Sequence, residues 1–161
     1  MAKMFSIAAS AFIFVTGKAA IAQADDSHIT QITMERTACF GTCPCYKLTI
    51  YDDGTIDYEG KEYVKEKGHR RGKVSAENLK KIRDSIEKLH FFELKDRYDR
   101  KENPDGSITR VTDLPTCITT VTKGSQTKRV EDYFGGPKEL EELERLIDEA
   151  TASSSWIGRN K

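Results

Sequence analysis

Three of the four cysteines in this 161-residue chain lie within seven positions, in the segment Cys39-Phe-Gly-Thr-Cys-Pro-Cys45, and the fourth is Cys117. In a reducing cytosol, closely spaced thiols typically bind a metal ion or carry out redox chemistry. In an oxidising compartment the same residues form disulfides. The compartment in which the chain resides therefore decides which chemistry this cluster is expected to have.

The N-terminus has the three parts of a secretory signal peptide. Lys3 makes the start basic, residues 5–17 are almost all apolar or small, and Ala22-Gln23-Ala24 resembles a cleavage site. This run of 13 residues is shorter than the roughly 20 that a membrane-spanning helix needs. We therefore predict that residues 1–24 are removed on export to the periplasm or the medium. An uncleaved anchor and a buried N-terminal helix are the alternatives.

The remaining residues, 25–161, are expected to form one domain with a core at about 29–157. Without Lys3 and Lys18 the chain keeps 24 basic and 26 acidic side chains. This balance gives no electrostatic reason to expect a nucleic-acid partner. No later segment is apolar enough to span a membrane.

Five segments are predicted as β-strands from their alternating or β-branched residues. They are Ile29–Thr37, Tyr46–Tyr51, Thr55–Val64, Cys117–Thr122 and Thr127–Phe134. Asp53-Gly54 and Gly124-Ser125 favour hairpin turns between neighbouring strands. We expect the polar segments 65–73 and 96–113 to be loops.

Two amphipathic helices are also predicted. Ser75 can cap a helix that ends near His90, and Pro137 suits the first turn of a second helix. The apolar stripes of the two helices are Leu79, Ile82, Ile86 and Leu89 in the first, and Leu140, Leu143, Ile147 and Ala150 in the second. The predicted fold is α+β: an antiparallel sheet of about five strands with both helices on one face.

Several landmarks together resemble a bacterial exported family catalogued as domain of unknown function 6438. The most specific is Glu35-Arg-Thr-Ala-Cys-Phe-Gly-Thr-Cys-Pro44, and Asp53-Gly54, Phe91-Phe92, Asp113-Leu-Pro-Thr116 and Trp156 follow in order. The resemblance spans about Ile29 to Ile157. It brings no established activity, and the chain departs from the family pattern at Cys45 and Cys117.

If the family signature acts as a unit, the resemblance implies a Cys39–Cys43 disulfide, which leaves Cys45 and Cys117 to form a second. Strand alternation is compatible with that second bridge if Ile118 points to the core, because both sulfurs then project from the uncovered face. The five-residue loop would contribute about 2 kcal/mol, and the long Cys45–Cys117 loop about 4.4 kcal/mol.

Two other kinds of chemistry remain open for the cysteines. A thiol-redox site would use Cys39 and Cys43, but the strand predicted after them does not provide the helix N-terminus that lowers a thiol pKa. A zinc or copper(I) site would combine the clustered cysteines with a histidine, the candidates being His28, His69 and His90.

The favoured function is non-catalytic binding or association with the cell envelope, by a disulfide-stabilised domain without a cofactor or metal. The partner would be a protein or a small ligand. The candidate binding residues either form the Cys39–Cys43 loop or flank the family landmarks: Arg36, Phe40, Gly41, Thr42, Tyr98 and Asp113. Buried ion pairs or loop anchors would explain Arg36, Tyr98 and Asp113 equally well.

Overall fold

The computed structural model describes residues 27–151 and 153–158. The predicted signal peptide therefore lies outside the described residues. In chain order the elements are β1 (Ile29–Arg36), β2 (Cys45–Tyr51), β3 (Thr55–Glu62), β4 (Gly68–Lys73), α1 (Ala76–Lys88), the 3₁₀ turn η1 (Phe91–Glu93), β5 (Arg97–Asp99), β6 (Lys101–Glu102), β7 (Ile108–Thr109), β8 (Cys117–Lys123), β9 (Gln126–Phe134), α2 (Lys138–Ala150) and α3 (Ser154–Ile157).

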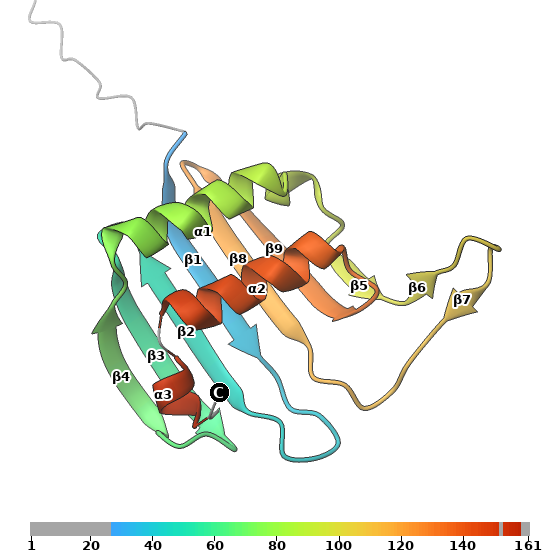
Figure 1. Cartoon of the computed structure of the whole chain (residues 1–161), viewed down its shortest axis with the longest axis horizontal. Coiled ribbons are helices and arrows are strands. Elements are labelled where there is room, and N and C mark those ends of the chain that lie inside the picture. The colour runs from blue at the N-terminus through green and yellow to red at the C-terminus, as the bar shows by residue number, and fades with distance from the viewer. Residues whose placement is uncertain (1–26, 152, 159–161) are drawn as a thin grey trace, which may run out of the picture.

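One seven-stranded sheet, in the order β4-β3-β2-β1-β8-β9-β5, forms the base of the molecule (Figure 1). All its pairs are antiparallel except β5–β9, which is parallel. The α+β class is confirmed, but the sheet is larger than the five strands predicted. β6 and β7 form a separate small hairpin that projects beyond the sheet (Figure 1).

The two additional strands come from segments predicted as loops. β4 pairs with β3 from Thr55↔Lys73 to Gly60↔Gly68, yet five of its six residues are exposed. An edge strand with both faces in water has no apolar alternation, so the periodicity that reveals a half-buried strand is missing. β5 has only three residues, which is too short for any period to show.

Both long helices pack on the same face of the sheet, where they lie side by side (Figure 1). Ser75 caps α1, because its Oγ accepts a hydrogen bond from the Asn78 backbone N–H at 3.2 Å. The core between the helices and the sheet includes Met34, Leu48, Ile56, Ile82, Val121 and Leu143, all of them 0 % exposed. Within the described residues, no helix has the length and apolar character needed to cross a membrane.

The phase of β8 differs from the prediction. Cys117, Thr119 and Val121 are buried, whereas Ile118 is only half-buried. Because Cys117 aligns with Arg36 and Asp132 in the neighbouring strands, its side chain lies on the face covered by the helices. This reversal moves the Cys117 thiol from the open face into the interior.

Candidate functional site

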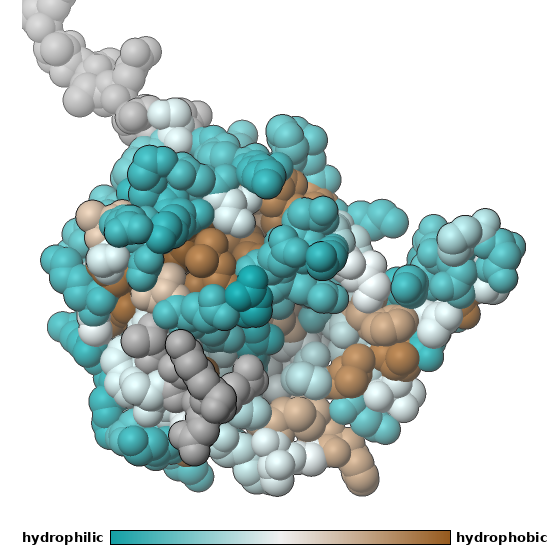
Figure 2. Space-filling model, viewed as in Figure 1, coloured by the Kyte–Doolittle hydropathy of each residue, from teal (hydrophilic) through white to brown (hydrophobic). Residues whose placement is uncertain are grey.

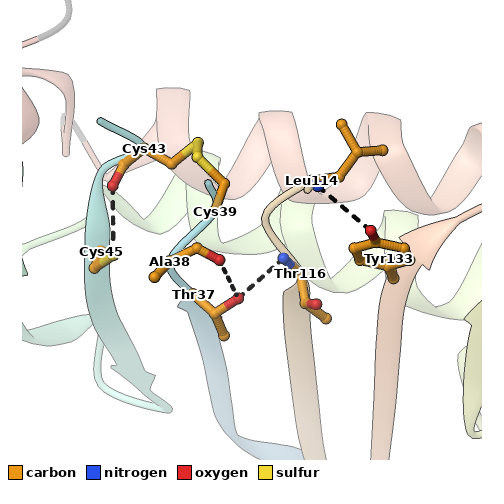
Figure 3. Close-up of a disulfide and its surroundings, with 8 residues drawn as sticks. All are labelled: Thr37, Ala38, Cys39, Cys43, Cys45, Leu114, Thr116 and Tyr133. Carbon is orange, nitrogen blue, oxygen red and sulfur yellow. Dashed lines mark hydrogen bonds between the residues drawn. A yellow bond between two sulfur atoms is a disulfide. The ribbon is translucent and has the colours of Figure 1, made fainter. Parts of the chain in front are cut away.

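The cysteine signature forms a closed loop between β1 and β2 (Figure 3). Cys39 and Cys43 are joined by a disulfide, and the side chain of Phe40 between them is 89 % exposed. Gly41 and Thr42 are also exposed. The disulfide thus restricts the loop while its aromatic side chain stays in water.

This loop is tied to the segment before β8. The Thr37 backbone N–H donates to the Thr116 carbonyl at 3.0 Å. The Thr116 N–H in turn donates to Thr37 Oγ1 at 3.0 Å (Figure 3). Further along the segment, the Leu114 N–H donates to the Tyr133 hydroxyl, which itself donates to the Val111 carbonyl at 3.2 Å. The two loops therefore form one end of the sheet, here called the loop end and defined as residues 37–44 and 111–116.

The predicted Cys45–Cys117 disulfide is wrong, because both residues are buried free thiols. Cys45 begins β2 and Cys117 begins β8, with β1 between these strands. Two strand spacings amount to about 9.6 Å, which exceeds the Cα separation that a disulfide can join. Only the first of the two pairings implied by the resemblance is present.

The geometry of this loop also bears on the redox and metal-binding alternatives for the cysteines. No helix begins at Cys39 or Cys43, since β2 starts at Cys45, so the loop lacks the dipole that activates a redox thiol. Among the described residues, no three His, Cys, Asp or Glu side chains are placed to hold a metal ion.

A second group of residues lies under the C-terminal half of α2, where β1 ends. Arg36 donates to Asp148 Oδ2 from Nη2 at 3.0 Å and to the Tyr46 hydroxyl from Nε at 3.0 Å. The Tyr46 hydroxyl and the Ser153 hydroxyl both donate to Asp148 Oδ1, at 2.5 and 3.1 Å. Asp148 is therefore fully partnered and joins β1, β2 and α2.

Burial and nearby charge shift the proton affinities in this group. Burial alone would lower the pKa of Arg36, but Cys117, Tyr46, Asp148 and Glu144 outweigh that effect and the pKa is raised. Burial, followed by the Asp148 carboxylate, raises the pKa of the Tyr46 hydroxyl. Arg36 thus remains a cation and Tyr46 a neutral donor at any physiological pH.

Glu144 of α2 differs from Asp148 because one of its carboxyl oxygens lacks a partner. The residue is 5 % exposed, and Oε1 is buried without a hydrogen bond in the described structure. Burial raises the Glu144 pKa from 4.5 to about 7, although the Cys117 thiol and Arg36 lower it. Burial, with Glu144 next, raises the pKa of the Cys117 thiol well above its ordinary value.

A cavity of about 370 Å³ opens beside Glu144. Its walls come from the ends of β1, β8 and β9, from the turn before α2 and from the loop end. Gly136 forms part of this turn, and a Cβ there would lie 2.6 Å from Asp132 Oδ1. A side chain at this position would therefore displace the Asp132 carboxylate from the cavity wall.

The structure separates the candidate binding residues. Arg36 lines the cavity, whereas Phe40, Gly41 and Thr42 lie on the disulfide loop and do not line it. Asp113 is an exposed residue of the loop end with a φ of 68°.

Tyr98 does not line this cavity. It lies in β5 at the sheet edge, packed against the core, and its hydroxyl accepts a hydrogen bond from the Lys95 N–H at 3.3 Å. The interpretation of Tyr98 as a structural anchor fits these contacts.

Glu144, Asp148, Tyr46 and Asp132 were not predicted to belong to a site. Glu144 and Asp148 are spaced four apart on a helix, which places them on one face. Both directly follow a core position of that helix, Leu143 and Ile147 respectively. A carboxylate directly after a core position was the one sign in the sequence that these residues are buried. It does not show which strand residues face them.

A family model covers most of the described chain. The chain belongs to the family described as Domain of unknown function (DUF6438). The family model matches residues 30–151, from β1 to the residue after α2. No curated protein matches the chain. The matched region includes the disulfide loop, the loop end and all the charged residues that line the cavity.

Proposed function

We propose that this protein is an exported, non-catalytic binding domain, and that its loop end contacts a protein partner in the cell envelope. The observation that carries the proposal is Phe40, an aromatic side chain 89 % exposed on a loop closed by the Cys39–Cys43 disulfide. Exposed aromatic residues are enriched among the anchors of protein interfaces. A loop that is already ordered loses less conformational entropy on binding.

The neighbouring segment extends the same apolar surface. Leu114 is 42 % exposed and lies in the segment that hydrogen bonds hold next to the disulfide loop. Brown and tan atoms gather at this end of the molecule, below and beside the helices (Figure 2). The predicted export signal and the presence of a disulfide support an extracytoplasmic location.

Photo-crosslinking in the producing cell tests the proposal. A benzophenone amino acid replaces Phe40 in one variant and Tyr51 in another, because Tyr51 is an aromatic residue 36 % exposed at the end of β2 opposite to the loop end. We expect a discrete protein adduct from position 40 and none from position 51. Leu114→Lys should weaken the adduct at position 40.

Two results would contradict the proposal. The same adducts from both positions would mean that contact is non-specific. Recovery of the protein only from the cytoplasm, with an intact N-terminus by mass spectrometry, would mean that it is not exported.

A further inference from the structure

The cavity beside α2 has an unusual charged lining. Three of its residues carry carboxyl groups: Asp132 from β9, and Glu141 and Glu144 from α2. The basic residues on the wall are Arg36, which Asp148 neutralises at 3.0 Å, and Lys101, which is exposed on the projecting hairpin. The cavity therefore has an excess of negative charge.

Glu144 supplies an independent indication of a ligand. Glu144 is one of the residues that line the cavity, it is 95 % buried, and its Oε1 has no hydrogen-bond partner in the described chain. A buried polar atom left without a partner costs about 1–3 kcal/mol, and more for a charged group. A donor that enters the cavity would remove this cost.

Part of the cavity lining is apolar. Leu114, Pro115 and Phe134 contribute to it, and Leu114 is also exposed at the surface of the loop end. A ligand that suits both kinds of lining has a cationic donor group and an aliphatic chain. The three carboxyls do not converge as a metal site would require.

We propose that this cavity binds an alkylammonium ion, with Glu144 as the buried counter-charge and Leu114, Pro115 and Phe134 around the aliphatic chain. The ion can come from a free amine or from a lysine side chain of another protein, because both have the same chemistry. The proposal goes beyond the binding function proposed for Phe40 and does not depend on it.

Proton linkage follows from the groups around Glu144. Cys117 of β8, Arg36 of β1, Asp132 of β9, and Glu141 and Asp148 of α2 surround it. Burial raises the Glu144 pKa to about 7, whereas an alkylammonium stays charged to about pH 10. Because the cation pairs with the ionised carboxylate, its affinity should rise about tenfold between pH 6 and pH 8.

Amide chemical-shift titration of the ¹⁵N-labelled protein tests the proposal. The probes are n-butylammonium, Nα-acetyl-lysine methylamide and, as a control of opposite charge, n-butyrate. We expect both cations at pH 7.5 to shift the amides of Gly135, Gly136 and Glu144, and butyrate to leave them unchanged. The tighter of the two cations identifies the free amine or the lysine side chain as the better ligand.

Two variants of the same helix make the test specific. Glu144→Gln should weaken n-butylammonium binding about tenfold and abolish its pH dependence. Glu149→Gln removes the same charge from an exposed position that pairs with Arg145 at 2.7 Å, so it should change the affinity less than twofold. Equal affinities for wild type and Glu144→Gln, or no shift with either cation, would overturn the proposal.

A third variant separates this proposal from the function proposed for the loop end. Phe40→Ala should leave n-butylammonium binding unchanged, because Phe40 does not line the cavity. Loss of ammonium binding in this variant would show that the cavity and the loop act as one site, which would contradict the independence of the two proposals.

Discussion

The two long helices have the same length and cover the same face of the sheet, but what they bury differs. α1 buries Leu79, Ile82 and Ile86, all apolar. α2 buries Leu140, Leu143 and Ile147 and, in the same stripe, the carboxyl of Glu144. The contrast shows that one face of an amphipathic helix can do two things. Some of its positions complete the core, and neighbouring positions contribute to a polar site.

The strand ends explain why the polar residues gather under α2. Beneath this helix lie Arg36, Tyr46, Cys117 and Asp132, which occupy aligned positions in β1, β2, β8 and β9. Arg36 and Tyr46 both find a partner in Asp148 of this helix. Glu144 Oε1 is the exception, and that exception distinguishes a candidate ligand site from a structural ion pair.

The greatest loss of stability is expected for the ion pair that fixes α2 to the sheet. Asp148→Ala should lower the free energy of unfolding by about 3–5 kcal/mol, because it leaves the mostly buried Arg36 cation and the Tyr46 hydroxyl without their acceptor. Urea denaturation measures this change. Glu149→Ala, which removes only an exposed helix pair, should cost no more than about 0.5 kcal/mol. Similar losses in both variants would show that the ion pair contributes little.

The apolar helix provides the next comparison. Ile82→Ala should lower the free energy of unfolding by about 3 kcal/mol, because the side chain is 0 % exposed and a cavity would remain. The same variant should bind n-butylammonium as wild type does when titrated under native conditions. A loss of ammonium binding in the folded variant would contradict the view that α1 serves only the core while α2 also forms the binding site.

The pH dependence of stability tests Glu144 without any ligand. The folded protein holds the Glu144 proton up to about pH 7, whereas the unfolded chain releases it near pH 4.5. Stability therefore falls as the pH rises from 4.5 to 7, by up to about 3 kcal/mol in total. Glu144→Gln removes this loss, so its stability relative to wild type should increase with pH over that interval. Parallel pH profiles from urea denaturation would contradict the assignment.

The disulfide loop should contribute least to stability. Replacement of both Cys39 and Cys43 by serine should lower the free energy of unfolding by about 2 kcal/mol, since the closed loop is short. Peptide mapping without reduction should find Cys39 linked to Cys43, with Cys45 and Cys117 as free thiols. A peptide linking Cys45 to Cys117 would contradict the strand order of the sheet.

Sequence patterns predicted the five longest strands and both helices, because each has a side that faces the core and therefore shows a regular apolar period. β4 and β5 were missed for the opposite reason. β4 is exposed on nearly all positions, and β5 is only three residues long. Both are held by backbone hydrogen bonds to a neighbouring strand, and such bonds leave no trace in side-chain type.

The residues of the site were predictable to different degrees. Spacing and the family resemblance were enough to predict the Cys39–Cys43 loop and to mark Arg36. The partner of Cys45 could not be found in this way, because strand order is a long-range property and β1 separates β2 from β8. The phase of Cys117 depended on which face the helices cover, and the prediction chose the wrong one.

The local properties of this protein follow from the sequence alone: the pattern of an export signal, amphipathic helices, hairpins and a loop of closely spaced cysteines. These depend on residues a few positions apart. Which distant residues meet depends on the tertiary structure. Arg36 and Asp148 are 112 positions apart, and Cys117 and Glu144 come together only because α2 crosses β8 (Figure 1). The unpaired carboxyl of Glu144 exists because folding removes it from water, and no pattern of neighbouring residues encodes that burial.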